Sequence, residues 1–459
     1  MDTLPLPQRP NVEQYRKRAK ALVAAANSGE AEVLDNWAAE WLKALRKSPG
    51  NELTPFVQGS LDRAIEHLRR SVDARRTRSE AGRLTLSDAQ HVIAQAHSYE
   101  TWAAFATAVE ALRADNEKSD FERAADAIVD GDLETLDALL ARNPGLVREK
   151  SARTHYATLL HYVAANGVED FRQKTPPNAV DVAQRLIAAG ADVNATADTY
   201  SKDLYQTTMN LLVSSTHPAE AGLQSVLVEV LLDHGAKING LEDNGSPILT
   251  ALAFGYPEAA ETLARRGARI DHVVIAAALG RVDLVREWVI DPVTLSKAHA
   301  PYRGPYWVHI PDDAKGQIEL SLVAACRFGR ADVARFLLDL GVSPASQDHD
   351  RMTALHWAAA RGLYEILEIL LARQAPLEVR NTWGGTVVDS TAWFAANAPV
   401  PGVDYARVVE RLLEAGADPD EIYPPLTGIS AIDEVIRSYR EAGAVNTKKP
   451  NADRAKPGG

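Results

Sequence analysis

Two histidines, His161 and His356, carry the side chains of this chain that could most readily bind a metal ion or transfer a proton. Neither has a second ligand at the spacing of a metal site, and the sequence contains no His-Glu-x-x-His, Cys-x-x-Cys, P-loop or Gly-x-Ser-x-Gly string. Each histidine instead follows a threonine by three residues, Thr158 and Thr353. Because threonine is a good helix N-cap, we predict that both pairs are structural. We expect no catalytic residue, no metal and no cofactor.

The other reactive groups also favour structural roles. Asp348-His349-Asp350 resembles a fragment of a calcium loop, but the rest of that pattern is missing, so a solvated turn is favoured. Cys326 lies in an apolar stretch and is interpreted as a small core residue rather than a reactive thiol. Since it is the only cysteine, no intrachain disulfide can form. This is typical of a reducing compartment and predicts a cytoplasmic protein.

The Thr–His pairs recur because the chain itself repeats. A Gly-Ala dipeptide, or a degenerate copy of it, follows several leucine-rich amphipathic stretches, and the step from position 341 to 374 is 33 residues. The clearest unit covers residues 348–379, with a short helix, a turn at Gly362 and a second helix. One such unit cannot bury its apolar face alone, so neighbouring units must stack. About eight repeats fit between residues 120 and 445, and residues 426–444 are expected to close them as a helix pair.

Insertions interrupt this period. They cover residues 168–178, 216–222, 296–315 and 395–404. Long loops cost little closure entropy, yet insertions on one face of a repeat protein often belong to its binding side. The third insertion contains Tyr302, Tyr306 and Trp307. It is interpreted as packing on a shortened repeat, with a lid or contact arm as the alternative.

Residues 1–113 differ from the repeats. Apolar spacing such as Tyr15, Ala19 and Leu22 predicts helices, and Ser87-Asp88-Ala89-Gln90 predicts a capping box. We therefore expect a small helical domain over residues 1–113, a repeat domain over 120–445 and a disordered tail over 446–459. The predicted fold class is all-α, a solenoid of helix-turn-helix repeats with short hairpin loops that follows a small helical domain.

Charge is distributed unevenly along the chain. Residues 1–115 hold 16 Lys and Arg against 15 Asp and Glu, whereas the remainder holds 34 against 47. An acidic repeat region argues against nucleic-acid binding, so proteins, including basic proteins, are the expected partners. The basic run from Arg69 to Arg83 is interpreted as a solvated helix and loop. The alternatives are that it docks onto an acidic surface or that it associates with nucleic acid. No apolar run approaches the ~20 residues of a membrane span, and the first residues show no signal pattern, so no membrane association is expected.

The motifs resemble a known family. Thr353-Ala354-Leu355-His356 stands where ankyrin repeats carry Thr-Pro-Leu-His, and Thr158-Leu159-Leu160-His161 is a second copy. The chain resembles a bacterial ankyrin-repeat protein over about 325 residues. Segments 4–22 and 86–105 resemble an N-terminal helical module found ahead of such repeats. The resemblance implies an ankyrin-repeat solenoid that binds a macromolecule, and it implies no catalytic residues.

In ankyrin solenoids the two residues before the mid-repeat glycine face the concave side, so the resemblance implies which side chains line that face. In this chain they are bulky or aromatic in most successive repeats. We predict a partly apolar groove for a protein partner, formed by Asn166, Phe254, Phe328, Arg361, Trp393 and Phe394, with Trp383 nearby. The alternative is that inserted loops cover these side chains and make them core.

The sequence thus favours an interaction scaffold that is not an enzyme and that binds protein through a concave groove. The alternative function is a small-ligand binder or a hydrolase, with a pocket roofed by the inserted loops. The sequence predicts neither the oligomeric state nor the identity of the partner.

Overall fold

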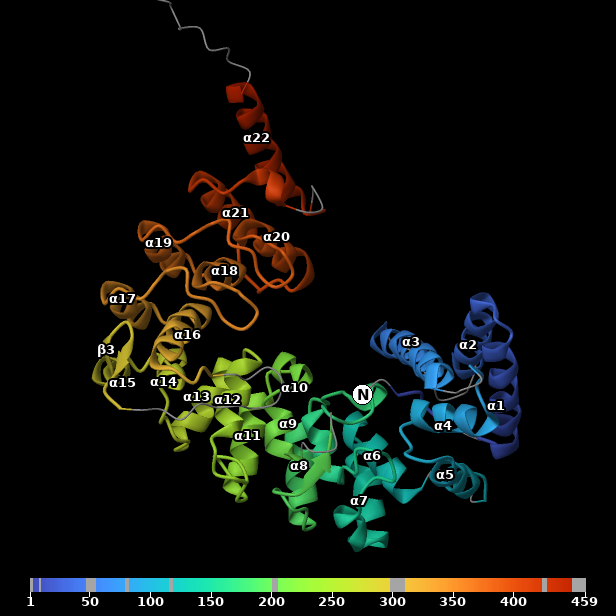
Figure 1. Cartoon of the computed structure of the whole chain (residues 1–459). Coiled ribbons are helices and arrows are strands. Elements are labelled where there is room, and N and C mark those ends of the chain that lie inside the picture. The colour runs from blue at the N-terminus through green and yellow to red at the C-terminus, as the bar shows by residue number, and fades with distance from the viewer. Residues whose placement is uncertain are drawn as a thin grey trace, which may run out of the picture. The chain divides into compact units, whose positions relative to one another are not determined.

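The computed structural model describes residues 3–7, 10–46, 55–78, 82–114, 119–199, 205–297, 310–422 and 427–447 (Figure 1). These residues are mostly helical, with two short antiparallel hairpins among them. The chain forms two compact units, residues 1–268 and 269–459. The insertion residues Tyr302, Tyr306 and Trp307 and most of the predicted tail, 448–459, lie outside the described residues.

The first unit opens with helices whose apolar faces meet in one core. They are α1 (Val12–Asn27), α2 (Ala31–Arg46), α3 (Pro55–Arg78), α4 (Leu86–Ala96) and α5 (Trp102–Ala114). Trp41 and Phe105 are buried in this core and both contact the His97 ring. Leu4 closes the core, since its N–H donates to the Ala96 carbonyl and its carbonyl lies 2.7 Å from His97 Nδ1. The predicted helical N-terminal region is confirmed.

The N-cap of α4 lies two residues earlier than predicted. Thr85, rather than Ser87, caps the helix, because its hydroxyl accepts the backbone N–H of Asp88 at 3.1 Å. The Asp88 carboxylate accepts the Thr85 N–H in return, also at 3.1 Å. Aspartate at the third helical position therefore closes the capping box that the sequence pattern had assigned to Gln90.

Stacked helix pairs complete the first unit. Their elements are α6 (Asp120–Asp130), α7 (Leu133–Arg142), η1 (Pro144–Arg148), η2 (Leu159–Ala164), η3 (Asp170–Arg172), α8 (Ala179–Ala188), α9 (Thr208–Leu212), α10 (Thr216–Glu220), α11 (Gln224–Asp233), α12 (Ser246–Ala253) and α13 (Pro257–Arg265). Strands β1 (Thr196–Asp198) and β2 (Tyr205–Thr207) pair antiparallel, with Ala197 opposite Gln206.

The second unit continues the same pattern. Its elements are α14 (Val273–Ala278), α15 (Val282–Trp288), β3 (Val289–Asp291), β4 (Thr294–Leu295), α16 (Ala314–Arg327), α17 (Ala331–Asp339), α18 (Ala354–Ala360), α19 (Tyr364–Ala372), α20 (Val387–Asn397), α21 (Tyr405–Glu414), η4 (Pro419–Glu421) and α22 (Ser430–Thr447). We call α14, α16, α18 and α20 the first helices and α15, α17, α19 and α21 the second helices. Successive first helices lie side by side (Figure 1). The expected closing helix pair is wrong, because Gly443 lies within the single helix α22 instead of ending it.

Small residues make this stacking possible. Ala358, Ala359 and Ala360 of α18 are at most 1% exposed, so α16 and α20 can both approach α18 closely. Gly362 follows at φ 64°, in the left-handed region that favours glycine. A Cβ at this glycine would collide with the Val403 side chain, which lies in the insertion before α21. The local backbone and the packing of the insertion therefore both require glycine here.

Charged side chains are buried where the first repeats meet the N-terminal helices. Arg153, Arg172 and Glu169 are at most 2% exposed. Arg153 pairs with Glu169 and, at 3.1 Å, with Glu122, while Arg172 lies 2.8 Å from both Glu122 and Asp126. We call these five residues the buried ionic cluster. Burial alone would raise the pKa of Glu122, but the two arginines outweigh it and lower that pKa to about 2.

Glu169 and Arg172 of the insertion at residues 168–178 are therefore buried and supply part of this cluster. The cluster also reaches the N-terminal helices. Arg153 Nη1 donates to the His97 carbonyl at 2.9 Å, and the adjacent Thr154 N–H donates to the Ser98 carbonyl at 2.8 Å. Hydrogen bonds from Arg153 and Thr154 thus connect the helical region to the first repeats.

Removing one member of the buried ionic cluster should cost far more than removing a surface pair. Arg153→Ala leaves Glu169 buried with one cation fewer, so we expect the free energy of unfolding to fall by about 3–5 kcal/mol. The matched control is Arg185→Ala, whose exposed guanidinium lies 2.9 Å from Asp137 and should cost less than about 1 kcal/mol. Urea denaturation followed by circular dichroism measures both losses. Equal losses would contradict a structural role for the cluster.

Candidate interaction surface

The two Thr–His pairs have the same geometry in their separate repeats. His161 Nδ1 accepts the Thr158 N–H at 3.1 Å and lies 2.8 Å from its hydroxyl. His356 makes the same contacts with Thr353, at 3.2 and 2.8 Å. Burial lowers the pKa of each histidine to about 4, so both rings are neutral near pH 7. Each ring braces the start of its repeat and is shielded from solvent.

In the part of the chain that the structure describes, the cysteine thiol is buried and the potential metal ligands are dispersed. No group of three or more His, Cys, Asp and Glu side chains in that part is arranged to hold a metal ion. Cys326 is buried in α16, and burial raises the pKa of its thiol well above the ordinary range. The same described helices include none that is long and apolar enough to cross a membrane.

Aromatic rings and arginines gather at one end of the first helices in the second unit. We define the aromatic–arginine surface by the partly exposed side chains that α16, α18, α20 and their C-caps place there, namely Arg327, Phe328, Trp357, Arg361, Trp393 and Phe394. Trp393 is 56% exposed. Its ring meets Phe394 edge-on, with the two centroids 5.3 Å apart.

These side chains contact one another across the three helices. The Arg327 guanidinium lies 4.3 Å from the Trp357 ring centroid and 5.3 Å from that of Phe328. Arg361 reaches Phe328 from the next helix, at 5.9 Å from the ring centroid. The Phe394 centroid lies 6.1 Å from that of Trp357. Because cation–π and tilted ring contacts hold these side chains in place, the surface is largely preformed.

Trp357 belongs to this surface although the sequence pattern missed it. Its indole N–H donates to the Asp348 carboxylate at 2.7 Å. Asp348 also accepts the backbone N–H groups of Asp350 and Met352, at 3.0 and 2.9 Å. This carboxylate therefore organises the turn before α18 and orients the indole. The turn is thus more ordered than the solvated turn that was predicted for Asp348-His349-Asp350. The signal that could have found Trp357 is its position four residues before Arg361, on the same helix face.

The two arginines of the surface differ in their surroundings. Burial, followed by repulsion from Arg361, lowers the pKa of Arg327 to about 10, while Asp348 and Asp350 act in the opposite direction. Burial also lowers the pKa of Arg361. Within the described residues, Arg361 makes no ion pair and no side-chain hydrogen bond. Both arginines are cationic at neutral pH, so this surface presents positive charge beside exposed rings.

The other predicted groove residues belong to other elements of the chain. Asn166, in the first unit, donates its amide N–H to the Ser214 hydroxyl at 3.0 Å and so braces the next repeat. Phe254 is 37% exposed at the end of α12, also in the first unit. Trp383 is 73% exposed on the turn between α19 and α20. Of the predicted residues that it describes, the structure thus brings together those of α16, α18 and α20.

Acidic residues of the second helices pair with arginines of neighbouring repeats. Arg411 of α21 lies 2.6 Å from Glu368 of α19, and Arg335 of α17 lies 2.6 Å from Glu365. Each exposed pair contributes little to stability. The pairs nevertheless balance acidic charge on the second helices, so the net negative charge of the repeats does not describe the aromatic–arginine surface.

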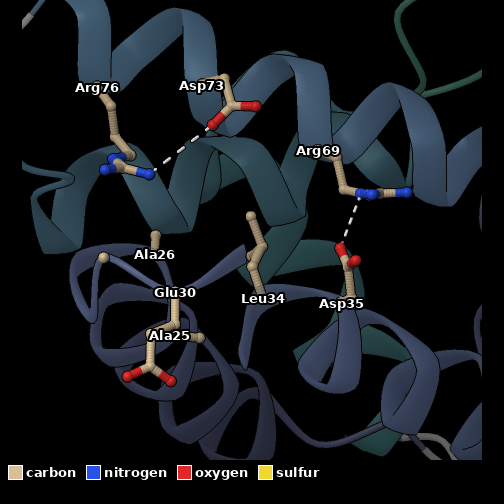
Figure 2. A pocket seen from close by; sticks show the side chains of 9 residues that line it. Ala25, Ala26, Glu30, Leu34, Asp35, Arg69, Asp73 and Arg76 are labelled. Carbon is tan, nitrogen blue, oxygen red and sulfur yellow. Dashed lines mark ion pairs between the residues drawn. The ribbon is translucent and has the colours of Figure 1, made fainter. Parts of the chain in front are cut away.

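The basic run of α3 is largely matched by its own surroundings. A small pocket of about 180 Å³ lies between α1, α2 and α3. Figure 2 shows its lining, with Arg69 and Arg76 in the wall. Arg69 lies 3.0 Å from Asp35, and Arg76 lies 3.9 Å from Asp73. Since these arginines already have acidic neighbours, the run favours a solvated helix over a nucleic-acid site.

Residues 273–381 match a family model described as ankyrin repeats in three copies. The chain contains ankyrin repeats. The predicted fold class, an all-α ankyrin-repeat solenoid preceded by a helical region, is confirmed. Repeats of this family generally mediate protein–protein interaction and are typically not catalytic.

Short stretches of the chain resemble curated proteins from plants and a virus. Over 88 residues, the chain is 33% identical to the potassium channel KOR2 of Oryza sativa subsp. japonica. These residues make up 19% of this chain and 12% of that protein. It is 39% identical over 70 residues to the putative ankyrin repeat protein L92 of Acanthamoeba polyphaga mimivirus, covering 15% and 17%. It is 42% identical over 50 residues to serine/threonine-protein kinase 12 of Arabidopsis thaliana, covering 11% of each. The chain therefore spans at most 17% of the length of these relatives.

Among solved structures, the crystal structure of the human ASB11 ankyrin repeat domain is similar over 64% of this chain and 98% of that chain, with 22% identity and a TM-score of 0.30. The matched family residues begin at 273, within the second unit. The bacterial origin and the N-terminal helical module that the resemblance implied stay predictions.

The buried histidines should make the repeats sensitive to mild acid. Because the folded pKa of His356 is about 4 and its unfolded value is about 6.5, its stabilising effect is complete above pH 6.5 and is lost as the pH falls toward 4. We expect His356→Gln to reduce the dependence of unfolding free energy on pH in that range by about 1.4 kcal/mol per pH unit. Urea denaturation at several pH values measures this slope. An unchanged slope would show that this ring is not neutral in the folded protein.

Proposed function

We propose that the chain is an interaction scaffold whose ankyrin repeats bind a protein partner through the aromatic–arginine surface. The observation that carries this proposal is that Trp393, which is 56% exposed, contacts Phe394 on the same helix, and that Phe394 in turn contacts Trp357 on α18. Aromatic and arginine side chains supply much of the binding energy of protein interfaces. Contiguous apolar patches on a protein surface often mark such interfaces. The predicted concave groove and a cytoplasmic location form part of this proposal.

The residues outside the surface have subsidiary roles in the proposal. Trp383 belongs to the same repeat as Trp393 and would contact the edge of the partner, whereas Asn166 braces its own repeats. The small-ligand or hydrolase alternative needs a deep cleft with converging polar groups near Trp307 or Trp393. Trp307 lies outside the described residues. Around Trp393, the rings and arginines contact one another, and this supports the interaction scaffold.

A pair of truncations tests the surface directly. Phe328→Ala combined with Phe394→Ala should lower capture of the partner from a native extract at least about tenfold, because each ring is expected to contribute about 1–2 kcal/mol to binding. Chemical cross-linking with mapped residues measures the capture, and circular dichroism should show unchanged helicity.

The matched control for these truncations is Phe336→Ala. Phe336 is also half-buried beside an arginine, with Arg286 at 4.8 Å from the ring centroid, but it lies on the second helix α17. Its removal should leave capture unchanged. Cross-links confined to the second helices would contradict the proposal, and loss of helicity in the double variant would show that the two rings are core.

A further inference from the structure

Arg361 is a half-buried cation with no anion beside it in the part of the chain that the structure describes. Its guanidinium lies 5.9 Å from the Phe328 ring centroid, and among the described residues it has neither an ion pair nor a side-chain hydrogen bond. A guanidinium beside a ring can still donate in a bidentate manner to a carboxylate. Since a charge withdrawn from water is costly when unpaired, an anion supplied by a ligand would be favoured at this position.

Among the described residues, no carboxylate of the second unit pairs with Arg361. Asp348, which acts on the neighbouring arginine, already accepts an indole N–H and two backbone N–H groups. Residues 298–309 and 423–426, whose structure is not described, contain no Asp or Glu. The tail 448–459 contains one Asp against four Lys and Arg. The sequence and the contacts therefore both direct attention to a carboxylate from another molecule.

The apolar part of the surface sets the size of the ligand. Its rings run from Phe328 on α16, which the Arg327 guanidinium links to Trp357 on α18, and then through Phe394 to Trp393 on α20. Packed helices lie about 8–10 Å apart, so three successive first helices span roughly 20 Å. An extended chain covers that length with about six residues.

We infer that the aromatic–arginine surface takes an extended acidic and apolar segment of the partner, in which the carboxylate of an Asp or Glu pairs with Arg361. An aromatic or leucine side chain a few residues away packs on Phe394 and Trp393. This inference rests on the proposed function and adds the chemistry of the partner. It differs from the basic partner that the net charge of the repeats suggests, because the acidic residues of the second helices are paired with arginines of the chain itself.

A random 12-residue peptide library displayed on phage is the probe. It is selected against the full chain, against Arg361→Gln, and against the Phe328→Ala, Phe394→Ala double variant. The matched control is Arg373→Gln, which removes a guanidinium that pairs with Asp339 among the second helices. We expect the unaltered chain and this control to enrich peptides that carry Asp or Glu within about four residues of an aromatic residue or leucine. Arg361→Gln should lose the acidic bias and bind a selected synthetic peptide about tenfold more weakly.

The outcomes separate this inference from the proposed function. Enrichment of basic peptides, or an acidic bias that survives in Arg361→Gln, would overturn the inference and leave the proposed function standing. Enrichment that the double variant does not reduce, or no enrichment above the bare support, would contradict the proposed function as well. Arg361→Glu gives a second measurement, because it should bind the selected peptide only after the acidic residue of that peptide is replaced by lysine.

Discussion

The close stacking of neighbouring helix pairs is the interaction on which the rest of the structure depends. A single pair leaves one apolar face in water, so each repeat is stable only against its neighbours. Alanines such as Ala359 and the left-handed Gly362 allow the required approach. The same stacking repeats each position at a fixed step. Phe328, Arg361 and Phe394 are separated by 33 residues each, and for that reason they meet on one surface.

The two units use charge in different ways. In the first unit, the buried ionic cluster lies within the first repeats, and its Arg153 also donates a hydrogen bond to the N-terminal helices. Buried ion pairs add little net stability but penalise any arrangement that leaves one charge alone, so they specify how the first repeats pack. In the second unit, acidic side chains stay on the second helices and pair across repeats, while two arginines lie among rings at the ends of the first helices. This separation leaves two arginines beside the rings of this surface, although the chain as a whole is acidic.

Local signals explain most of what could be predicted from the sequence. Backbone conformation and capping within a few residues determine the repeat period, the Thr–His pairs and the mid-repeat glycines. These local signals therefore predict the fold class from the sequence alone. The inward packing of the insertion at residues 168–178 depends on partners such as Glu122, far away in the sequence, so its charged residues resemble solvated ones. Trp357 was missed because the repeat alignment considers the pair before the glycine, whereas an indole four residues before Arg361 reaches the same face. The N-cap of α4 was predicted at Ser87 and lies at Thr85, because Ser and Thr both cap helices and the two residues stand only two positions apart.

The central claim is that a partner binds at the ends of the first helices in the second unit. Amide hydrogen exchange of the full chain, measured alone and with the partner recovered by cross-linking, tests this claim most directly. Binding is expected to slow exchange around residues 324–329, 357–362 and 391–397, where α16, α18 and α20 carry the aromatic–arginine surface. Slowing confined to α17, α19 and α21, with no change in those segments, would contradict it.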